Sequence, residues 1–157
     1  MMLRNNGALL AALTAVVVLA IGWGLREGAF AAEKAKLLES QTVNLADAGL
    51  KDYLFEKDVR GRIAIFLKGQ TAGTRDFVVG QLQLNPGLEP HPIHKHPEEE
   101  VLIVASGKGE ISCDGKTTKV GAGSVMYTAP NAPHGIKNTG DDVMTFYFVK
   151  FTAKPKQ

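Results

Sequence analysis

The chain has little cysteine and no excess of charge of either sign. Cys113 is the only cysteine among 157 residues, which excludes an intramolecular disulfide and a zinc site built from several cysteines. The 18 basic and 16 acidic side chains nearly cancel, which excludes the strongly basic surface typical of nucleic-acid binding. We therefore expect a domain stabilised by its apolar core, with no nucleic acid as partner.

The long hydrophobic run, residues 7–25, lies between Arg4 and Arg26 and carries no charge. A basic start, an apolar middle and small residues up to Ala31 are typical of a secretory signal peptide cleaved after that alanine. The run is also long enough to span a bilayer, so a retained membrane anchor is the alternative. If residues 1–31 are a cleaved signal peptide, we expect the remaining chain to be periplasmic or secreted. If they are a retained anchor, we expect it to be held at the membrane outside the cytoplasm.

The rest of the chain has the pattern of an all-β domain. Its 17 glycines and 7 prolines lie mostly beyond residue 60 and separate short β-rich runs, so long helices are not expected there. The expected strands are residues 62–68, 76–84, 99–105, 110–113, 117–120, 124–128, 135–138 and 143–152. Asp114-Gly115 predicts a type I′ hairpin turn. We therefore divide the chain after residue 31 into a tether and entry segment at 32–61, a barrel or sandwich at 62–152 and a tail at 153–157.

The entry segment permits two interpretations. Residues 43–45 and 53–55 are candidate entry strands, whereas residues 45–59 fit either a helix or a strand followed by a loop. The sequence pattern does not choose between them.

The four histidines, His91, His94, His96 and His134, lie close together in the sequence. In an extended segment His94 and His96 project from the same face, and Glu100 follows four residues later at the start of a strand. His134 arrives from a second segment whose prolines stiffen the chain. Three imidazoles and a carboxylate suit one divalent transition metal ion, Fe, Mn, Ni, Cu or Zn, with coordination positions left open for chemistry.

These residues lie in two longer motifs. Residues 87–107, GLEPHPIHKHPEEEVLIVASG, resemble the first motif of the cupin superfamily, and residues 123–138, GSVMYTAPNAPHGIKN, resemble its second. The resemblance implies a small single-domain cupin, a double-stranded β-barrel of the jelly-roll type. It implies the metal ligands His94, His96, Glu100 and His134. Each motif has one extra residue in a loop, which leaves this ligand set unchanged.

Strand alternation extends the site to a pocket. If Glu100 and His134 face inward, Leu102 and Asn138 do as well. On the strand at 76–84 we favour the glutamine-bearing face as a pocket wall, with solvent exposure of that face as the alternative. The predicted pocket residues are Gln81, Gln83, Leu102, Tyr127, Asn138 and Phe146. We expect His91 at the barrel mouth or on the surface, and Glu98 and Glu99 in a solvated acidic turn.

Three functions remain open, the least favoured of them a structural barrel that serves as a dimer unit. The first is a mononuclear metal enzyme of the dioxygenase, isomerase or lyase type that acts on a small oxygenated molecule. The alternative is a non-catalytic module that binds a small ligand or a metal. A homodimer is expected with each of these functions. The sequence identifies neither the substrate nor the metal.

Overall fold

A computed structural model describes residues 36–155, which belong to the compact unit Lys34–Gln157. The predicted signal peptide or anchor, residues 1–31, lies outside the described residues. Among the described residues, no helix has the length and apolar character needed to cross a membrane.

The described chain is almost entirely β-structure, which confirms the predicted fold class. One short helix, α1 (Leu45–Ala48), precedes the strands. The strands are β1 (Lys51–Phe55), β2 (Asp58–Gly69), β3 (Thr74–Leu84), β4 (Glu99–Ser106), β5 (Lys108–Cys113), β6 (Lys116–Gly121), β7 (Val125–Thr128), β8 (His134–Asn138) and β9 (Met144–Ala153). Each strand expected beyond residue 62 is present with small shifts at its ends.

The segment left open by the sequence forms both kinds of structure. Helix α1 takes its first turn, and β1 then pairs with the start of β2 in an antiparallel hairpin, with Phe55 opposite Asp58. This pairing extends β2 four residues before its expected start at Arg62. The candidate entry strand at 43–45 does not form, because its last residue begins α1.

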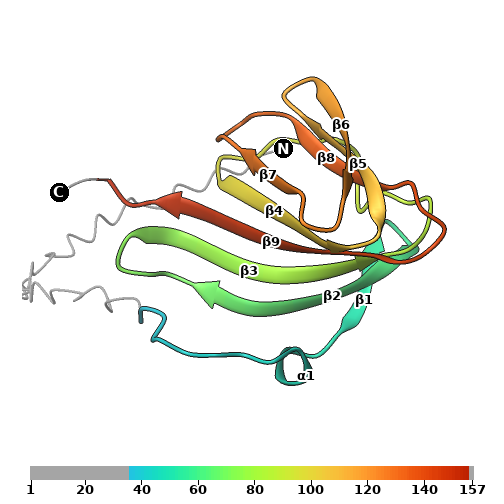
Figure 1. Cartoon of the computed structure of the whole chain (residues 1–157). Coiled ribbons are helices and arrows are strands. Elements are labelled where there is room, and N and C mark those ends of the chain that lie inside the picture. The colour runs from blue at the N-terminus through green and yellow to red at the C-terminus, as the bar shows by residue number, and fades with distance from the viewer. Residues whose placement is uncertain (1–35, 156–157) are drawn as a thin grey trace, which may run out of the picture. The chain divides into compact units, whose positions relative to one another are not determined.

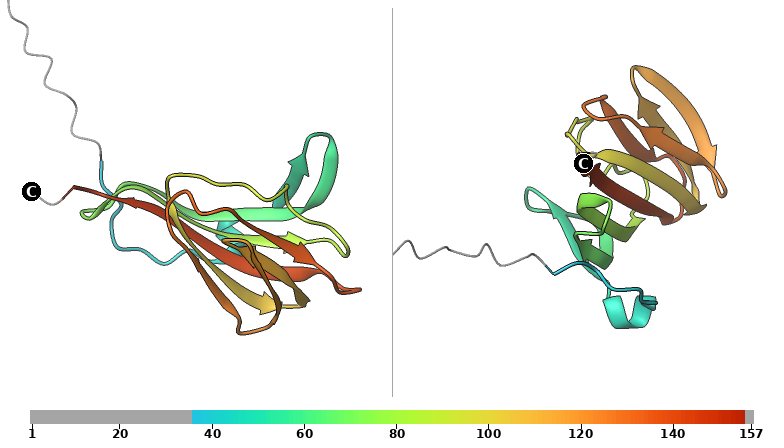
Figure 2. Two further views of the ribbon diagram at one scale, coloured as in Figure 1. Left: turned by 90° about the horizontal axis from the view of Figure 1, so that it is seen from above. Right: turned by 90° about the vertical axis from the view of Figure 1, so that its left-hand side faces the viewer.

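The strands form two antiparallel sheets (Figure 1). The larger has the order β1-β2-β3-β9-β4-β7 and the smaller the order β6-β5-β8. The two further views follow the same arrangement, with the hairpin of β5 and β6 set apart from β1 and β2 (Figure 2). Apolar side chains from both sheets make one core, so the sheets are packed face to face. This core consists of Leu82, Leu84, Leu102, Val104, Ile111, Met126, Ile136, Met144 and Phe146.

Side-chain alternation places the predicted inward residues of β4 and β8 as expected. Glu100 and Leu102 are buried on β4, whereas Ile103 between Leu102 and Val104 is 40% exposed. On β8, the buried residues include His134 and Asn138. The inward face of each strand therefore begins with a polar candidate ligand and continues toward the apolar core.

The predicted hairpin turn joins β5 to β6. Asp114 and Gly115 both have positive φ, 47° and 79°, as a type I′ turn requires. Cys113 pairs with Lys116 directly across the turn, which sets the register of the hairpin.

Candidate metal centre

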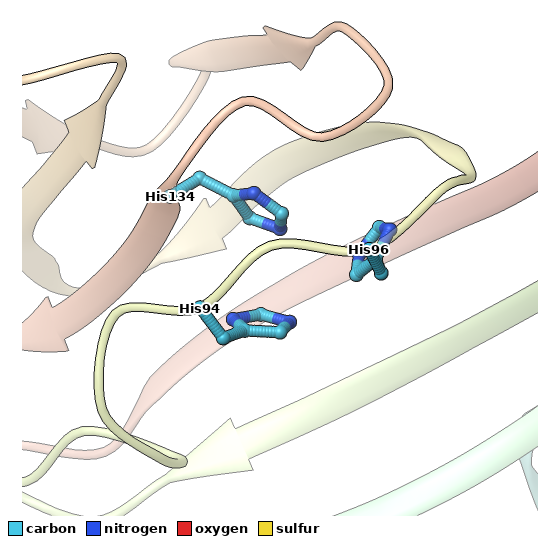
Figure 3. A group of neighbouring side chains, drawn as sticks. All are labelled: His94, His96 and His134. Carbon is cyan, nitrogen blue, oxygen red and sulfur yellow. The ribbon is translucent and has the colours of Figure 1, made fainter.

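Three histidines from two separate segments lie close together (Figure 3). His94 and His96 lie between β3 and β4, and His134 is the first residue of β8. The backbones of His94 and His134 exchange two hydrogen bonds, N to O, of 3.0 and 2.9 Å. The amide of Asn131 donates to the carbonyl of His96 at 2.8 Å. Backbone pairing therefore fixes the segments that carry the rings.

The three rings are close enough to bind one ion. One potential ligand atom from each of His94, His96 and His134 lies within 4.8 Å of the others. Metal–nitrogen bonds of roughly 2.0–2.1 Å hold neighbouring ligand atoms roughly 3–4 Å apart, so small ring rotations bring this group into a coordination shell. The predicted fourth ligand, Glu100, comes from β4 and is buried beside two of the rings.

The hydrogen bonds of His134 leave its Nε2 atom directed at a carboxylate. Its Nδ1 lies 2.9 Å from the carbonyl oxygen of Ala132, which can only accept, so Nδ1 carries a proton. In a neutral ring Nε2 is then a bare lone pair, and it lies 2.9 Å from Oε2 of Glu100. Two acceptors at this distance repel unless a proton or a cation lies with them.

His96 repeats this arrangement. Its Nδ1 lies 3.2 Å from the carbonyl oxygen of Glu98 and 3.1 Å from the Glu98 carboxylate, and both are acceptors. Its Nε2 therefore also faces Oε2 of Glu100, at 3.0 Å. Glu98 and Glu99 are half-buried, which corrects the expectation of a solvated acidic turn. Instead Glu98 orients His96, in the way that outer partners orient metal-bound histidines.

His94 is a neutral ring with an unsatisfied nitrogen. Its Nδ1 is buried and has no hydrogen-bond partner among the described residues. Burial above all, together with the neighbouring His91, His134 and His96 and against the opposing effect of Glu100, lowers the pKa of His94 to about 4. At neutral pH the ring therefore has a free lone pair, which is the form that binds metals.

The metal-free protein is expected to lose stability as the pH falls from about 6.5 toward 4. In the unfolded chain His94 takes up a proton near its ordinary pKa of 6.5, but in the folded chain only near 4. The unfolded state thus binds more protons in this window, and the free energy of unfolding decreases as the pH is lowered. Urea unfolding in the presence of a chelator at several pH values measures this. His94→Gln should make the free energy of unfolding less dependent on pH in this window. If the variant showed the same dependence as the wild type, His94 would not be its cause.

A cavity of about 180 Å³ opens beside the histidines. Its apolar wall comes mainly from the larger sheet, and its polar residues gather around Glu100. The lining residues are Tyr53, Ile63, Leu82, Pro90, His91, His94, His96, Glu100, Leu102, His134, Gly135, Ile136, Phe146, Phe148 and Lys150. Of the six predicted pocket residues, Leu102 and Phe146 are in this wall.

The preference for the glutamine face of β3 is wrong. Leu82 lines the cavity, so Gln81 and Gln83 project from the opposite face of the strand. Leu82 pairs with Phe146 of β9, and this register commits the leucine face to the interior. Gln81 is nevertheless buried, and its Oε1 has no hydrogen-bond partner in the part of the chain that the structure describes.

Tyr127 and Asn138 also lie outside the cavity. Tyr127 is 57% exposed because it alternates with the buried Met126 and Thr128, and its hydroxyl donates to Glu99 at 2.8 Å. This hydrogen bond raises the pKa of Tyr127. Asn138 faces inward as predicted but serves the backbone: its Nδ2 donates to two carbonyl oxygens and its Oδ1 accepts from the amide of Gly140.

Sequence reasoning missed several residues of the cavity. Tyr53 lies in the entry segment that the sequence left open, and burial raises its pKa. Lys150 interrupts the apolar face that begins with Phe146 and Phe148, a signal that the alternation of β9 already contained. His91 lies at the mouth, with its ring centroid 4.1 Å from that of His94.

Solved structures share this fold. An RmlC-like cupin from Shewanella frigidimarina has a TM-score of 0.59 and 15% identity, covering 74% of this chain and 94% of its own. A predicted oxalate decarboxylase from Thermotoga maritima has a TM-score of 0.57 and 24% identity, covering 71% and 98%. The polyketide cyclase RemF from Streptomyces resistomycificus has a TM-score of 0.57 and 20% identity, covering 74% and 83%. At these identities the likeness establishes the fold alone.

Comparison by sequence gives one family. No curated protein matches the chain. Residues 80–150, which hold all four candidate ligands, match the family described as Cupin domain. The family match is confined to these residues, and the structural neighbours show the fold, which is that of the jelly-roll cupin barrel.

Proposed function

We propose that this chain binds one divalent transition metal ion through His94, His96, His134 and Glu100 and acts on a small oxygenated molecule in the adjoining cavity. The observation that carries the proposal is the convergence of two Nε2 atoms, on His96 and His134, on one carboxylate oxygen at 3.0 and 2.9 Å. A cation among these atoms would be coordinated by all three of them. The unsatisfied Nδ1 of His94 beside them adds to the support.

The donor set determines which chemistry is available. Imidazole and carboxylate ligands suit Fe, Mn, Ni, Cu or Zn, and a bound ion supplies Lewis-acid chemistry or, where it is redox-active, oxygen chemistry. Three imidazoles and one carboxylate leave positions free on an octahedral ion. The proposed reaction is therefore of the dioxygenase, isomerase or lyase type.

The chain's own residues prepare the site for a ligand. Glu98 and the Ala132 carbonyl fix the ring orientation of His96 and His134 by accepting from their Nδ1 atoms. Leu102 and Phe146 exclude water from the cavity wall, which strengthens electrostatic interactions inside it. No serine, threonine or cysteine lines the cavity among the described residues, so the site offers no hydroxyl or thiol nucleophile of those three kinds.

The structural neighbours add support for an enzyme. One is described as a predicted oxalate decarboxylase and another as a polyketide cyclase, so the fold is used for reactions of oxygenated molecules. These descriptions belong to those proteins, and the substrate of this chain is a separate question.

Metal analysis of the purified chain tests the proposal. The protein is prepared without chelator and its metal content measured by mass spectrometry; we expect a near-stoichiometric transition metal. Iron or copper would direct activity assays to oxygen uptake, and zinc, nickel or manganese to isomerase and lyase substrates. Bound metal without turnover of any compound would favour the non-catalytic binding module. A protein that takes up no metal would contradict the proposal.

The proposed location and assembly have their own measurements. We propose that residues 1–31 export or anchor the chain so that the barrel functions outside the cytoplasm, and that the barrel pairs as a homodimer. Cell fractionation with mass spectrometry of the N-terminus distinguishes cleavage after Ala31 from a retained anchor. Light scattering of the purified chain gives the oligomeric state.

A further inference from the structure

Lys150 lines the cavity beside the candidate metal centre. It lies on β9 and pairs in register with Glu100 of β4. Directly opposed residues of an antiparallel pair project from the same face, with Cβ atoms roughly 4.5–5.5 Å apart. Both side chains line the cavity. The lysine stem therefore starts next to the carboxylate that lies among the histidines.

The ammonium group of Lys150 has no carboxylate partner. Within residues 36–155 no acidic oxygen lies within 4.0 Å of Lys150 Nζ. Its neighbour Glu100 is instead directed at His96 and His134. Of the described side chains that line the cavity, Lys150 is the only lysine or arginine. The ammonium group of Lys150 is therefore free of a direct ion pair and can pair with an anion, while the Glu100 carboxylate faces His96 and His134.

The wall next to Lys150 is apolar. Phe146 and Phe148 share its face of β9, and Leu102 of β4 lies opposite Phe148. Gly80 of β3 leaves room for the Phe148 ring, because a side chain there would overlap it. A lysine stem lies well along such a surface, while its ammonium group requires water or an anion. A ligand with an apolar body and one negative end matches both parts of the wall.

We propose that the cavity binds a small monocarboxylate whose carboxylate pairs with Lys150 and whose apolar body lies against Leu102 and Phe148. This rests on the proposed function, because it places the ligand beside the proposed metal ion. A charge-assisted hydrogen bond to the ammonium selects the acid over its uncharged amide. Lys150 is then the residue that determines specificity for anions, and the histidines are not needed for that selection.

Paired ligands test this selection in metal-free and zinc-loaded protein. Acetate, 4-methylpentanoate and benzoate are each compared with the corresponding amide by isothermal titration calorimetry. In the wild type we expect at least one acid to bind about tenfold tighter than its amide. Lys150→Met should remove this preference and Lys150→Arg should retain it. Lys95→Met is the matched control, because Lys95 is exposed between His94 and His96 and does not line the cavity.

The metal content of each variant, measured in parallel, separates the two proposals. Loss of the acid preference in metal-free Lys150→Met supports the role of Lys150 even if the wild type binds no metal. A Lys150→Met protein that changes only in metal affinity would show that Lys150 acts on Glu100, and would overturn the proposal. Equal binding of acids and amides by the wild type, or binding of neither, would also overturn it.

Discussion

Replacing His134 with alanine is expected to weaken metal binding by at least about a hundredfold. Loss of a residue that merely orients a ligand typically costs about 10–100-fold in metal affinity, and His134 is itself a proposed ligand. It is the most buried of the three rings, 2% exposed, and its Nε2 lies 2.9 Å from Glu100. Mass spectrometry after dialysis, with competition against a chromophoric chelator, gives the metal content and affinity.

His91→Ala is the matched control for His134→Ala. The His91 ring packs against His94 with centroids 4.1 Å apart and lines the same cavity, but it is outside the group of close donor atoms. The His91→Ala variant should therefore keep its metal. Chelation should lower the melting temperature of the wild type and of His91→Ala, and leave that of His134→Ala unchanged. If His91→Ala and His134→Ala lost metal to the same extent, the proposed set of ligands would be wrong.

Asn138→Ala is expected to lower the free energy of unfolding by about 3 kcal/mol. The side chain is fully buried, 0% exposed. Its Nδ2 donates to the carbonyl oxygens of Leu84 and Asp142 at 3.0 and 2.8 Å, and its Oδ1 accepts from Gly140 at 2.9 Å. Removal loses these bonds and leaves buried backbone groups without partners, so the cost exceeds that of one hydrogen bond. Urea unfolding at neutral pH measures it.

The exposed neighbour Thr139 provides the comparison, and Thr139→Ala should change the free energy of unfolding by less than about 0.5 kcal/mol. Below its unfolding transition, Asn138→Ala should retain the wild-type metal content and ligand affinity, because Asn138 does not line the cavity. A variant as stable as the wild type that has lost ligand binding would instead restore Asn138 to the pocket.

Local patterns were sufficient to predict the strands and the donor residues. Alternating runs between glycine and proline turns marked each strand beyond residue 62, and Asp114-Gly115 marked its hairpin, because backbone twist in a two-residue turn depends only on local dihedral angles. The spacing of His94 and His96 and the position of Glu100 at a strand start likewise brought donors together through short-range geometry.

The choice of face depended on the tertiary register. Gln81 and Leu82 alternate on β3, and the sequence of that strand fits either face inward. Pairing of Leu82 with Phe146 across the sheet commits the leucine to the core, and Gln81 then lies on the opposite face. The same cause moved Tyr127 outward, since burial of Met126 and Thr128 fixes β7.

The sequence by itself determined that this is an all-β chain with three histidines and a glutamate in the spacing of a metal site. Only the tertiary structure decided what surrounds them, because these contacts join strands far apart in the chain. Pairing of β4 with β9 brings Lys150 beside Glu100, and pairing of β1 with β2 brings Tyr53 into the cavity. Burial among the other rings gives His94 its pKa of about 4, a property of the assembled site that no local segment contains.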